Sequence, residues 1–254
     1  MNEVLTSMKN PRIQLWRSLS ERKGRLDSGS FLVEGDKMVQ EALASRFDLR
    51  EILLREDRPA PAWLPDGVPV YVLSPHAFDA ISSQRTPQGI AAVLAMHAIP
   101  PAAGPRLLAL DGVQDPGNVG TILRTADAAG FSGALLSPAC ADVFSPKTLR
   151  ATMGSVFRLG LSFPASLPDA LLLLKNQGYA LLSSQLDGEP FYSRSPVTPP
   201  LVLIIGSEGN GVSEEIKALA THRLRLPMRG GAESLNAAVA AGIMMYDLIR
   251  EAGD

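Results

Sequence analysis

The sequence of residues 201–212 is LVLIIGSEGNGV, in which five apolar residues lead directly into a loop with three glycines. A short apolar run of this kind is typical of a strand buried on both faces of a parallel sheet. In an open α/β sheet, ligands bind at the carboxyl ends of the strands, where this loop must lie. Its pattern, G-x-x-G-x-G, matches neither the dinucleotide fingerprint nor a Walker-type phosphate loop. By itself the stretch also suits a glycine-rich turn with an exposed glutamate.

The pattern around this stretch predicts a parallel α/β domain over residues 106–254. Apolar runs predict strands at 106–110, 133–136, 179–183 and 201–205. Helical periodicity and capping signals predict helices at 118–129, 146–153, 168–176, 213–219 and 234–250. Ser234 is the predicted N-cap of the last helix. Helices between successive strands indicate a parallel sheet covered on both faces.

A second, smaller domain is predicted over residues 1–97, before a linker at residues 98–105. The linker sequence, AIPPAAGP, contains three prolines and a glycine, which do not suit a helix or a central strand. Before it, the pattern predicts strands at 31–33, 52–54, 70–73 and 90–94, a helix that begins at Asn10-Pro11, and a helix at 36–45. This mixture predicts a small α/β layer fold.

Composition excludes several classes of protein. Of the 254 residues, 46% are hydrophobic, which is enough for a hydrophobic core. This apolar content, together with a net charge of only −2, excludes wholesale disorder. One cysteine excludes a disulfide scaffold, and three scattered histidines indicate no metal site. The apolar stretch 235–249 is too short to span a bilayer, and the N-terminal residues lack a signal-peptide core. We therefore expect a soluble, cytoplasmic protein with no metal and no membrane partner.

The distribution of charge is more informative than its sum. The first 25 residues contain six basic and two acidic side chains. Such a basic edge can form a local phosphate-binding surface. A solvated helix face accounts for the same charges.

Two further segments place polar residues among apolar ones. In LDGVQDPGNVGTILRTADAAGF, residues 110–131, Asn118 opens a helix and Arg124 lies among apolar neighbours. Such an arginine pairs with an acid, contacts an anionic ligand, or occupies the surface between buried neighbours. In LRLPMRGGAESLN, residues 224–236, Asn236 lies in the first turn of the predicted helix. Asparagine is a poor residue for a helix interior, so its presence requires a hydrogen-bonding reason.

Three motifs in these segments resemble those of the SpoU (TrmH-like) class of SPOUT RNA methyltransferases. They are N-x-G-x-x-x-R at 118–124, I-G-S-E-G-x-G at 205–211 and L-P-M-x-G-x-x-x-S-L-N at 226–236. Each motif alone is weak, but the three in this order are specific. The N-terminal part, with FLVEG at 31–35 and TPQGIAAV at 86–93, is similar to the L30e-like RNA-binding domain often fused to these enzymes. The resemblance covers nearly the whole chain.

The resemblance implies a fold and an activity. The C-terminal domain is expected to be a SPOUT α/β-knot, a parallel sheet with a deep trefoil knot, preceded by the small L30e-like domain. The expected reaction transfers a methyl group from S-adenosylmethionine (AdoMet) to a ribose 2′-hydroxyl of rRNA or tRNA, and we take rRNA as the expected substrate. The expected assembly is a homodimer whose active site takes residues from both subunits.

The resemblance also implies roles for individual residues. The cofactor would contact Gly206, Glu208, Leu226, Met228, Ser234, Leu235 and Asn236. Arg124 would be the catalytic arginine, with Asn118, Glu208, Ser234 and Asn236 positioning it, the ribose or the cofactor. Because arginine stays protonated in proteins, we expect Glu208 or water to receive the proton. With RNA as partner, the expected phosphate contacts are Lys9, Arg12, Arg22, Lys23, Arg25, Lys147 and Arg150.

Alternative functions remain at this stage. A tRNA methyltransferase and a non-catalytic RNA-binding or ribosome-assembly protein would share the scaffold. A binding protein has no need for Arg124, Glu208, Ser234 and Asn236 together. A nucleotide-dependent dehydrogenase is disfavoured because G-x-G-x-x-G is missing after the first strand of either half. Methylation of a base nitrogen is disfavoured by the first motif.

Overall fold

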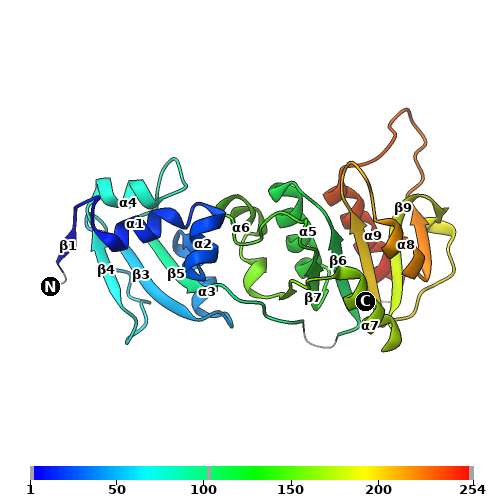
Figure 1. The fold of residues 1–254 in the computed structure, drawn as a ribbon, viewed down its shortest axis with the longest axis horizontal. Coiled ribbons are helices and arrows are strands. Elements are labelled where there is room, and N and C mark those ends of the chain that lie inside the picture. The colour runs from blue at the N-terminus through cyan, green and yellow to red at the C-terminus, as the bar shows by residue number, and fades with distance from the viewer. Residues whose placement is uncertain (1–2, 102–103, 252–254) are drawn as a thin grey trace. The chain divides into compact units, whose positions relative to one another are not determined.

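The computed structural model describes residues 3–101 and 104–251 (Figure 1), and contacts divide the chain into two compact units. The N-terminal unit comprises Met1–His97 and Phe144–Phe157, and the C-terminal unit comprises Ala98–Val143 and Arg158–Asp254. Each unit has a β-sheet and a hydrophobic core of its own. Residues 102–103 of the predicted linker lie outside the described residues, and the predicted domain boundaries stay a prediction.

The N-terminal unit contains a mixed five-stranded sheet in the order β1-β4-β3-β5-β2. Its strands are β1 (Val4–Leu5), β2 (Ser30–Glu34), β3 (Leu49–Arg55), β4 (Val70–Leu73) and β5 (Ile90–Ala95). β1, β4 and β3 run parallel, whereas β5 is antiparallel to both β3 and β2. All four strands predicted in this part of the chain are confirmed.

The helices of this unit are α1 (Pro11–Ser18), α2 (Arg22–Ser28), α3 (Asp36–Leu43), α4 (Pro75–Ile81) and α6 (Pro146–Thr152). Among the described residues, side-chain caps mark the start of three of these five helices: α1, α4 and α6. The predicted start at Asn10-Pro11 is confirmed, since the Asn10 side chain accepts a hydrogen bond from the backbone of Arg12. Helices α2 and α4 were not predicted. Ser74 caps α4 just before a proline, a start signal that sequence inspection can detect.

An aromatic cluster holds Phe144–Phe157 in the N-terminal unit. Phe144 lies 4.7 Å, between ring centroids, from Phe31 of β2. Phe47 contacts Phe31, Phe144 and Phe157 edge-on at 5.4 to 6.0 Å. The segment that carries α6 and the 3₁₀ turn Ser155–Phe157 therefore packs with a sheet that comes more than 50 residues earlier in the chain.

The C-terminal unit contains a six-stranded sheet in the order β11-β9-β10-β6-β7-β8, and all its strand pairs are parallel. The strands are β6 (Arg106–Asp111), β7 (Gly133–Leu136), β8 (Gly160–Ser162), β9 (Ala180–Pro190), β10 (Leu201–Gly206) and β11 (His222–Arg225). The predicted parallel α/β fold is confirmed. β8 was not predicted, and β9 extends well beyond the predicted strand.

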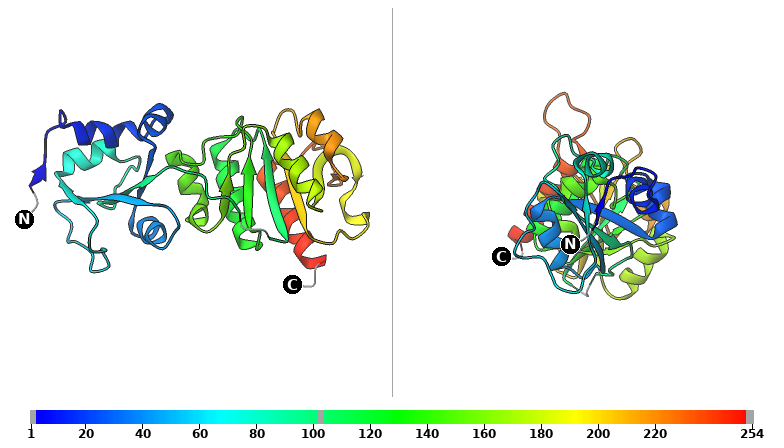
Figure 2. Two further views of the ribbon diagram at one scale, coloured as in Figure 1. Left: turned by 60° about the horizontal axis from the view of Figure 1, so that its bottom comes forward. Right: turned by 90° about the vertical axis from the view of Figure 1, so that its left-hand side faces the viewer.

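Helices cover both faces of this sheet, as Figure 2 shows. They are α5 (Pro116–Ala128), α7 (Leu167–Asn176), α8 (Glu214–Leu219) and α9 (Ala237–Glu251). Val202 and Ile204 of β10 pack with α7 and α8, while α5 and α9 pack against each other. Because both faces are covered, every residue of β10 is buried, which explains its unbroken apolar sequence.

The start of the last helix differs from the prediction. α9 begins at Ala237, and Ser234 precedes it in an exposed loop. The backbone N–H groups of Ala238 and Val239 donate to Asn236 Oδ1 at 2.9 and 3.3 Å. Asn236 is therefore the capping residue, and the prediction of Ser234 as the cap is wrong. An N-cap position explains an asparagine that fits poorly inside a helix.

The order of the strands does not show whether the chain is knotted. The predicted trefoil knot therefore stays a prediction.

Candidate active site

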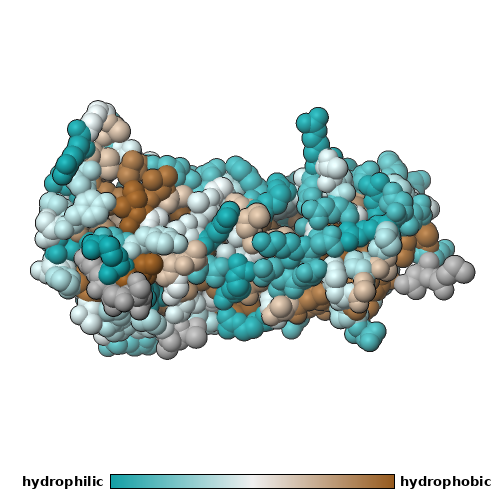
Figure 3. Space-filling view, turned by 180° about the vertical axis from the view of Figure 1, so that it is seen from behind, coloured by the Kyte–Doolittle hydropathy of each residue, from teal (hydrophilic) through white to brown (hydrophobic). Residues whose placement is uncertain are grey.

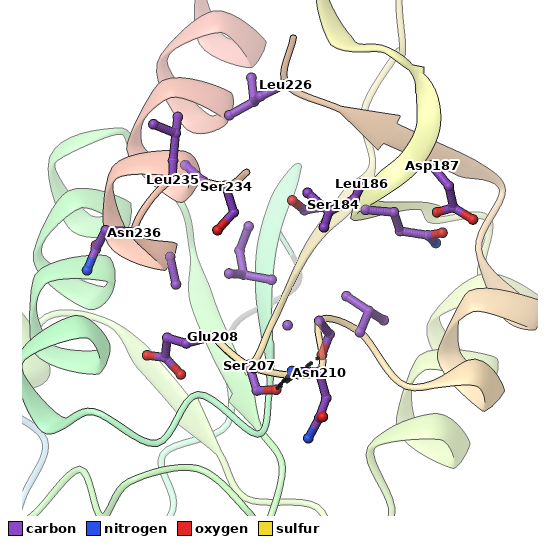
Figure 4. A pocket seen from close by; sticks show the side chains of 18 of the residues that line it. Ser184, Leu186, Asp187, Ser207, Glu208, Asn210, Leu226, Ser234, Leu235 and Asn236 are labelled. Carbon is purple, nitrogen blue, oxygen red and sulfur yellow. Dashed lines mark hydrogen bonds between the residues drawn. The ribbon is translucent and has the colours of Figure 1, made fainter. Parts of the chain in front are cut away.

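A cavity of about 560 Å³ lies at the carboxyl end of β10, between the loop that follows this strand and the start of α9 (Figure 4). Four segments form most of its wall: residues 184–187, 205–212, 226–228 and 234–240. All seven residues predicted to contact the cofactor are on this wall: Gly206, Glu208, Leu226, Met228, Ser234, Leu235 and Asn236. The structure thus brings together two motifs that are separated in the sequence.

The glycine loop after β10 has a closely folded backbone. Ser207 and Gly211 exchange two backbone hydrogen bonds of 3.0 Å, and Asn210 N donates to Ser207 Oγ at 3.1 Å. A Cβ atom built on Gly206 would lie 2.1 Å from the carbonyl carbon of Gly211. Only glycine therefore permits this turn, which directs the backbone and the Glu208 side chain along the cavity.

A polar network joins three segments at one side of the cavity. Asn236 Nδ2 donates to Asn118 Oδ1 at 3.0 Å, and Asn118 Nδ2 donates to Glu208 Oε1 at 2.6 Å. Asn118 lies in the first turn of α5, where its backbone N–H donates to the capping carboxylate of Asp115. One residue from each of the three motifs thus forms a continuous chain of hydrogen bonds. The exposed carboxylate of Glu208 ends this chain and can accept a further proton or hydrogen bond.

Arg124 is not on the cavity wall. It lies on α5 six residues after Asn118, and its side chain is exposed. Within the described part of the chain, its guanidinium forms no hydrogen bond or ion pair. Of the three possibilities for this arginine, pairing with an acid of the same chain is therefore excluded for the described residues. Its surface position leaves the guanidinium accessible to an anionic partner.

The predicted RNA contacts all lie in the N-terminal unit, and one of them is wrong. Arg25 is only 2% exposed, and its guanidinium donates to the carbonyl oxygens of Leu19 and Ser20 at 2.8 and 2.9 Å. It secures the turn between α1 and α2 and cannot reach a phosphate. The remaining predicted contacts are exposed: Lys9, Arg12, Arg22, Lys23, Lys147 and Arg150.

Two of the exposed arginines already have partners. Arg12 forms a 2.8 Å ion pair with Glu51, and its guanidinium lies 4.5 Å from the ring centroid of Tyr71. Arg150 donates to Ser83 Oγ at 2.7 Å.

The sequence analysis missed one wall of the cavity. Ser184, Gln185, Leu186 and Asp187 line it, although the predicted strand stopped at residue 183. The signal available was weak, because a glutamine that follows two serines at the end of a predicted strand has many explanations. Asp111, at the end of β6, was also missed. Its Oδ2 accepts the backbone N–H of Ser213 at 2.8 Å and so fixes the end of the glycine loop.

Metal and membrane sites are not found in the described residues. Over residues 3–101 and 104–251, no group of three or more His, Cys, Asp or Glu side chains could hold a metal ion. Over the same residues, no helix is both long and apolar enough to cross a bilayer.

A parallel α/β unit with a glycine-bounded cavity at its strand ends is typical of a protein that binds a small molecule at this edge of the sheet. Two family models match the chain. The SpoU rRNA Methylase family matches residues 105–246, and the MRM3-like substrate binding domain matches residues 10–92. The L30e likeness of the N-terminal unit stays a prediction.

Known proteins of similar length match both units. A 23S rRNA (guanosine(2553)-2′-O)-methyltransferase, RlmP of Bacillus subtilis, is 39% identical over 96% of this chain and 98% of its own. An AdoMet-bound rRNA methyltransferase from Sinorhizobium meliloti is 32% identical, with a TM-score of 0.87 over 98% of this chain and 97% of its own. AviRb of Streptomyces viridochromogenes, a SpoU methyltransferase solved with AdoMet, is 29% identical, with a TM-score of 0.86 over 97% and 99%. The chain belongs to the SpoU rRNA methylase family.

The protein is accordingly an RNA methyltransferase that uses AdoMet. Its cavity fits this cofactor in size, since small-molecule pockets occupy roughly 300–1,000 Å³. It also fits in chemistry, because the wall combines apolar side chains with a few polar groups and closely approaching backbone. One of these polar groups, Gln185 Oε1, is buried and has no hydrogen-bond partner among the described residues.

Proposed function

We propose that this protein methylates the 2′-hydroxyl of a ribose in rRNA, with AdoMet bound in the cavity at the end of β10. The observation that carries the proposal is the hydrogen-bonded chain from Asn236 through Asn118 to Glu208 on the cavity wall. Because this chain ends at a carboxylate on the cavity wall, it supports Glu208 as a proton acceptor beside the bound methyl donor. The RNA 2′-O-methyltransferases among the relatives support the same reaction.

Glu208 is proposed to receive the proton of the ribose hydroxyl. When bound, AdoMet supplies a methyl group that is already activated on a sulfonium. The protein must therefore hold the ribose hydroxyl in line with the breaking C–S bond, and alignment of this kind can contribute about 7–11 kcal/mol. As the O–C bond forms, the hydroxyl proton passes to the carboxylate of Glu208 directly or through water. Asn118 fixes one carboxylate oxygen at 2.6 Å, and the other accepts only a long, 3.5 Å contact from the backbone N–H of Gln114.

Arg124 is proposed to hold the ribose or its 3′-phosphate and to stabilise negative charge on the attacking oxygen. Its guanidinium is always protonated and offers a planar set of donors that suits phosphate. Its exposure and its lack of a partner among the described residues support this role. The residues proposed to contact the cofactor are the seven predicted ones, because all of them line the cavity: Gly206, Glu208, Leu226, Met228, Ser234, Leu235 and Asn236.

A homodimer is proposed as the active form. Exposed apolar side chains on α9 support it, since Val239 and Tyr246 are 51% and 50% exposed and lie seven residues apart on one helix face. Leu235, just before this helix, is 38% exposed. Figure 3 shows hydrophobic side chains gathered on the surface of the C-terminal unit. In a two-fold dimer built on this face, Arg124 would complete the cavity of the other copy.

rRNA is proposed over tRNA as the substrate. Two relatives that match this chain over nearly their whole length are named as 23S rRNA methyltransferases. The match of residues 10–92 to a substrate binding domain supports RNA contacts by the N-terminal unit. There we propose Lys9, Arg12, Arg22, Lys23, Lys147 and Arg150 as phosphate contacts, which position the RNA without specifying its sequence. An rRNA substrate agrees with the cytoplasmic location expected from the sequence.

The reaction is tested by incubating the purified protein with methyl-labelled AdoMet and unmodified rRNA, tRNA or ribosomal subunits. After digestion, we expect the label in a 2′-O-methylnucleoside from rRNA, free or in the subunit. Label in tRNA alone would contradict the substrate, and label on a base would contradict the reaction. Cofactor binding without transfer to any of the three would favour the non-catalytic RNA-binding alternative.

A further inference from the structure

β9 leaves the regular sheet directly beside the cavity. Its residues 180–183 pair in register with β10, and Ser183 pairs with Arg223 of β11. The next residue of β11, Leu224, pairs with Glu189, so residues 184–188 form an excursion without partners on β11. A Cβ atom on Gly188 would lie 2.5 Å from the backbone of Arg223. Glycine at this position therefore lets the chain return to the sheet, and the excursion is encoded in the sequence.

Within this excursion a polar side chain is buried and an apolar one is exposed, the opposite of the usual pattern in a soluble protein. Gln185 is only 8% exposed, whereas the adjacent Leu186 is 65% exposed. Both residues line the cavity, together with Ser184 and Asp187. Polar groups are normally left in water and leucines buried, so the reversal indicates that this wall serves a ligand rather than the core.

The amide of Gln185 is only half satisfied. Its Nε2 donates to Ser183 Oγ at 2.9 Å, while its Oε1 is buried and lacks a partner among the described residues. A buried polar atom without a partner destabilises the protein, and a ligand that supplies a hydrogen bond recovers that free energy.

The position of Gln185 in the cavity indicates which part of the cofactor it contacts. In Figure 4, Ser184, Leu186 and Asp187 lie across the cavity from Glu208 and Asn236. Since the transferred methyl must lie beside Glu208, the opposite wall contacts either the adenosyl or the methionyl arm of the sulfonium. The methionyl arm ends in an ammonium and a carboxylate, both charged, which are costly to place against the buried, neutral amide of Gln185. A glutamine amide, in contrast, pairs well with the amino edge of adenine.

We propose that Gln185 is the residue that recognises adenine: its Oε1 accepts a hydrogen bond from the 6-amino group of the bound cofactor. The inference rests on the proposed cofactor cavity and assigns the end of the cavity lined by Gln185 to the adenine ring. It makes Gln185 a determinant of cofactor specificity that takes no part in methyl transfer.

The test compares binding of S-adenosylhomocysteine with that of S-inosylhomocysteine, in which a carbonyl replaces the 6-amino group, by titration calorimetry. We expect the wild-type protein to prefer the adenosyl ligand about tenfold, the effect of one buried hydrogen bond. Gln185→Met should lower affinity for the adenosyl ligand about tenfold and leave affinity for the inosyl ligand unchanged. Gln185→Glu retains an acceptor and should keep the preference for adenine.

A second readout separates recognition from a structural role. Gln185→Met removes an unpaired buried oxygen and also the donor to the buried Ser183 Oγ, so the two effects offset and the thermal midpoint of the ligand-free protein should stay nearly unchanged while S-adenosylhomocysteine binding weakens. Gln177→Met, at an exposed glutamine after α7, is the matched control and should change neither quantity.

Three results would overturn the proposal. Equal loss of both ligands in Gln185→Met would show that the side chain only shapes the cavity. Equal affinity of the wild-type protein for both ligands would contradict adenine recognition here and leave the proposed function intact. Binding of neither ligand would contradict the cavity assignment itself, which the methyl-transfer assay examines separately.

Discussion

Glu208 shows what a single residue contributes in this molecule. Its Oε1 accepts the Asn118 amide at 2.6 Å, while its Oε2 lies 3.5 Å from the backbone nitrogen of Gln114. The motif in which it occurs could be found in the sequence. Its pairing with Asn118, 90 residues earlier, could not, because side-chain contacts between distant segments depend on how the strands are ordered.

Glu208→Gln should separate proton transfer from binding. An amide keeps the size of the side chain but cannot accept the ribose proton, so we expect a loss of about 10²-fold or more in the rate of transfer. AdoMet affinity should change little. Single-turnover methyl transfer measured across a range of pH tests this, and a wild-type rate at every pH would show that Glu208 is not the proton acceptor.

Arg25 and its basic neighbours should respond differently to substitution. Arg25→Ala leaves the carbonyls of Leu19 and Ser20 without donors and should destabilise the protein by about 1–3 kcal/mol. The pair Arg22→Ala and Lys23→Ala, at exposed positions, should leave stability within about 0.5 kcal/mol.

Denaturant unfolding and salt-dependent RNA binding measure these two effects. The Arg22 and Lys23 substitutions should weaken RNA binding and reduce its dependence on salt. RNA affinity unchanged by both would remove these residues from the proposed interface.

At the scale of elements, the first turn of α9 combines a structural and a functional task in one side chain. Asn236 Oδ1 caps the helix, and its Nδ2 donates to Asn118 in α5. The helix itself was predictable from its apolar period, but its start was not, since Ser234 and Asn236 are equally good caps by type. Packing of α9 on α5 decides between them, because it brings Asn236 to Asn118.

Two substitutions at Asn236 should separate these tasks. Asn236→Ala removes the cap and should lower the free energy of unfolding by about 0.5–2 kcal/mol. Asn236→Asp keeps a capping oxygen but cannot donate to Asn118, so it should remain stable and still lose activity. Thermal unfolding and methyl transfer are measured on both variants. Full activity in the aspartate variant would show that the contact with Asn118 is dispensable.

At the scale of the whole molecule, the position of Arg124 connects assembly to catalysis. It is exposed on α5 and absent from the cavity wall of its own chain. The apolar face of α9, with Val239 and Tyr246, supports a dimer in which it serves the other copy.

Mixed dimers test this arrangement. Arg124→Ala and Glu208→Ala chains, each inactive alone, are combined so that they exchange subunits. If Arg124 acts across the interface, half of randomly mixed dimers are heterodimers with one complete site, and activity should return to about one quarter of wild type. No recovery, with heterodimers demonstrated by mass, would place Arg124 in the site of its own chain.

The dimer face itself is tested by charged substitutions. Val239→Asp with Tyr246→Glu places two carboxylates on the exposed apolar face of α9 and should yield monomers, as measured by light scattering.

The sequence by itself determined the α/β class, most strands, and the three motifs, because strand burial and glycine loops are local properties read from neighbouring residues. From the motifs it was also possible to predict seven cofactor-contacting residues, and the structure shows that all seven line one cavity. Only the tertiary structure decided that Arg25 is buried, that Asn236 caps α9, and that residues 144–157 pack with the N-terminal sheet. It alone placed Gln185 in the cavity wall. Each of these depends on contacts between segments far apart in the chain, and the sequence pattern around a residue does not specify which distant segment will cover it.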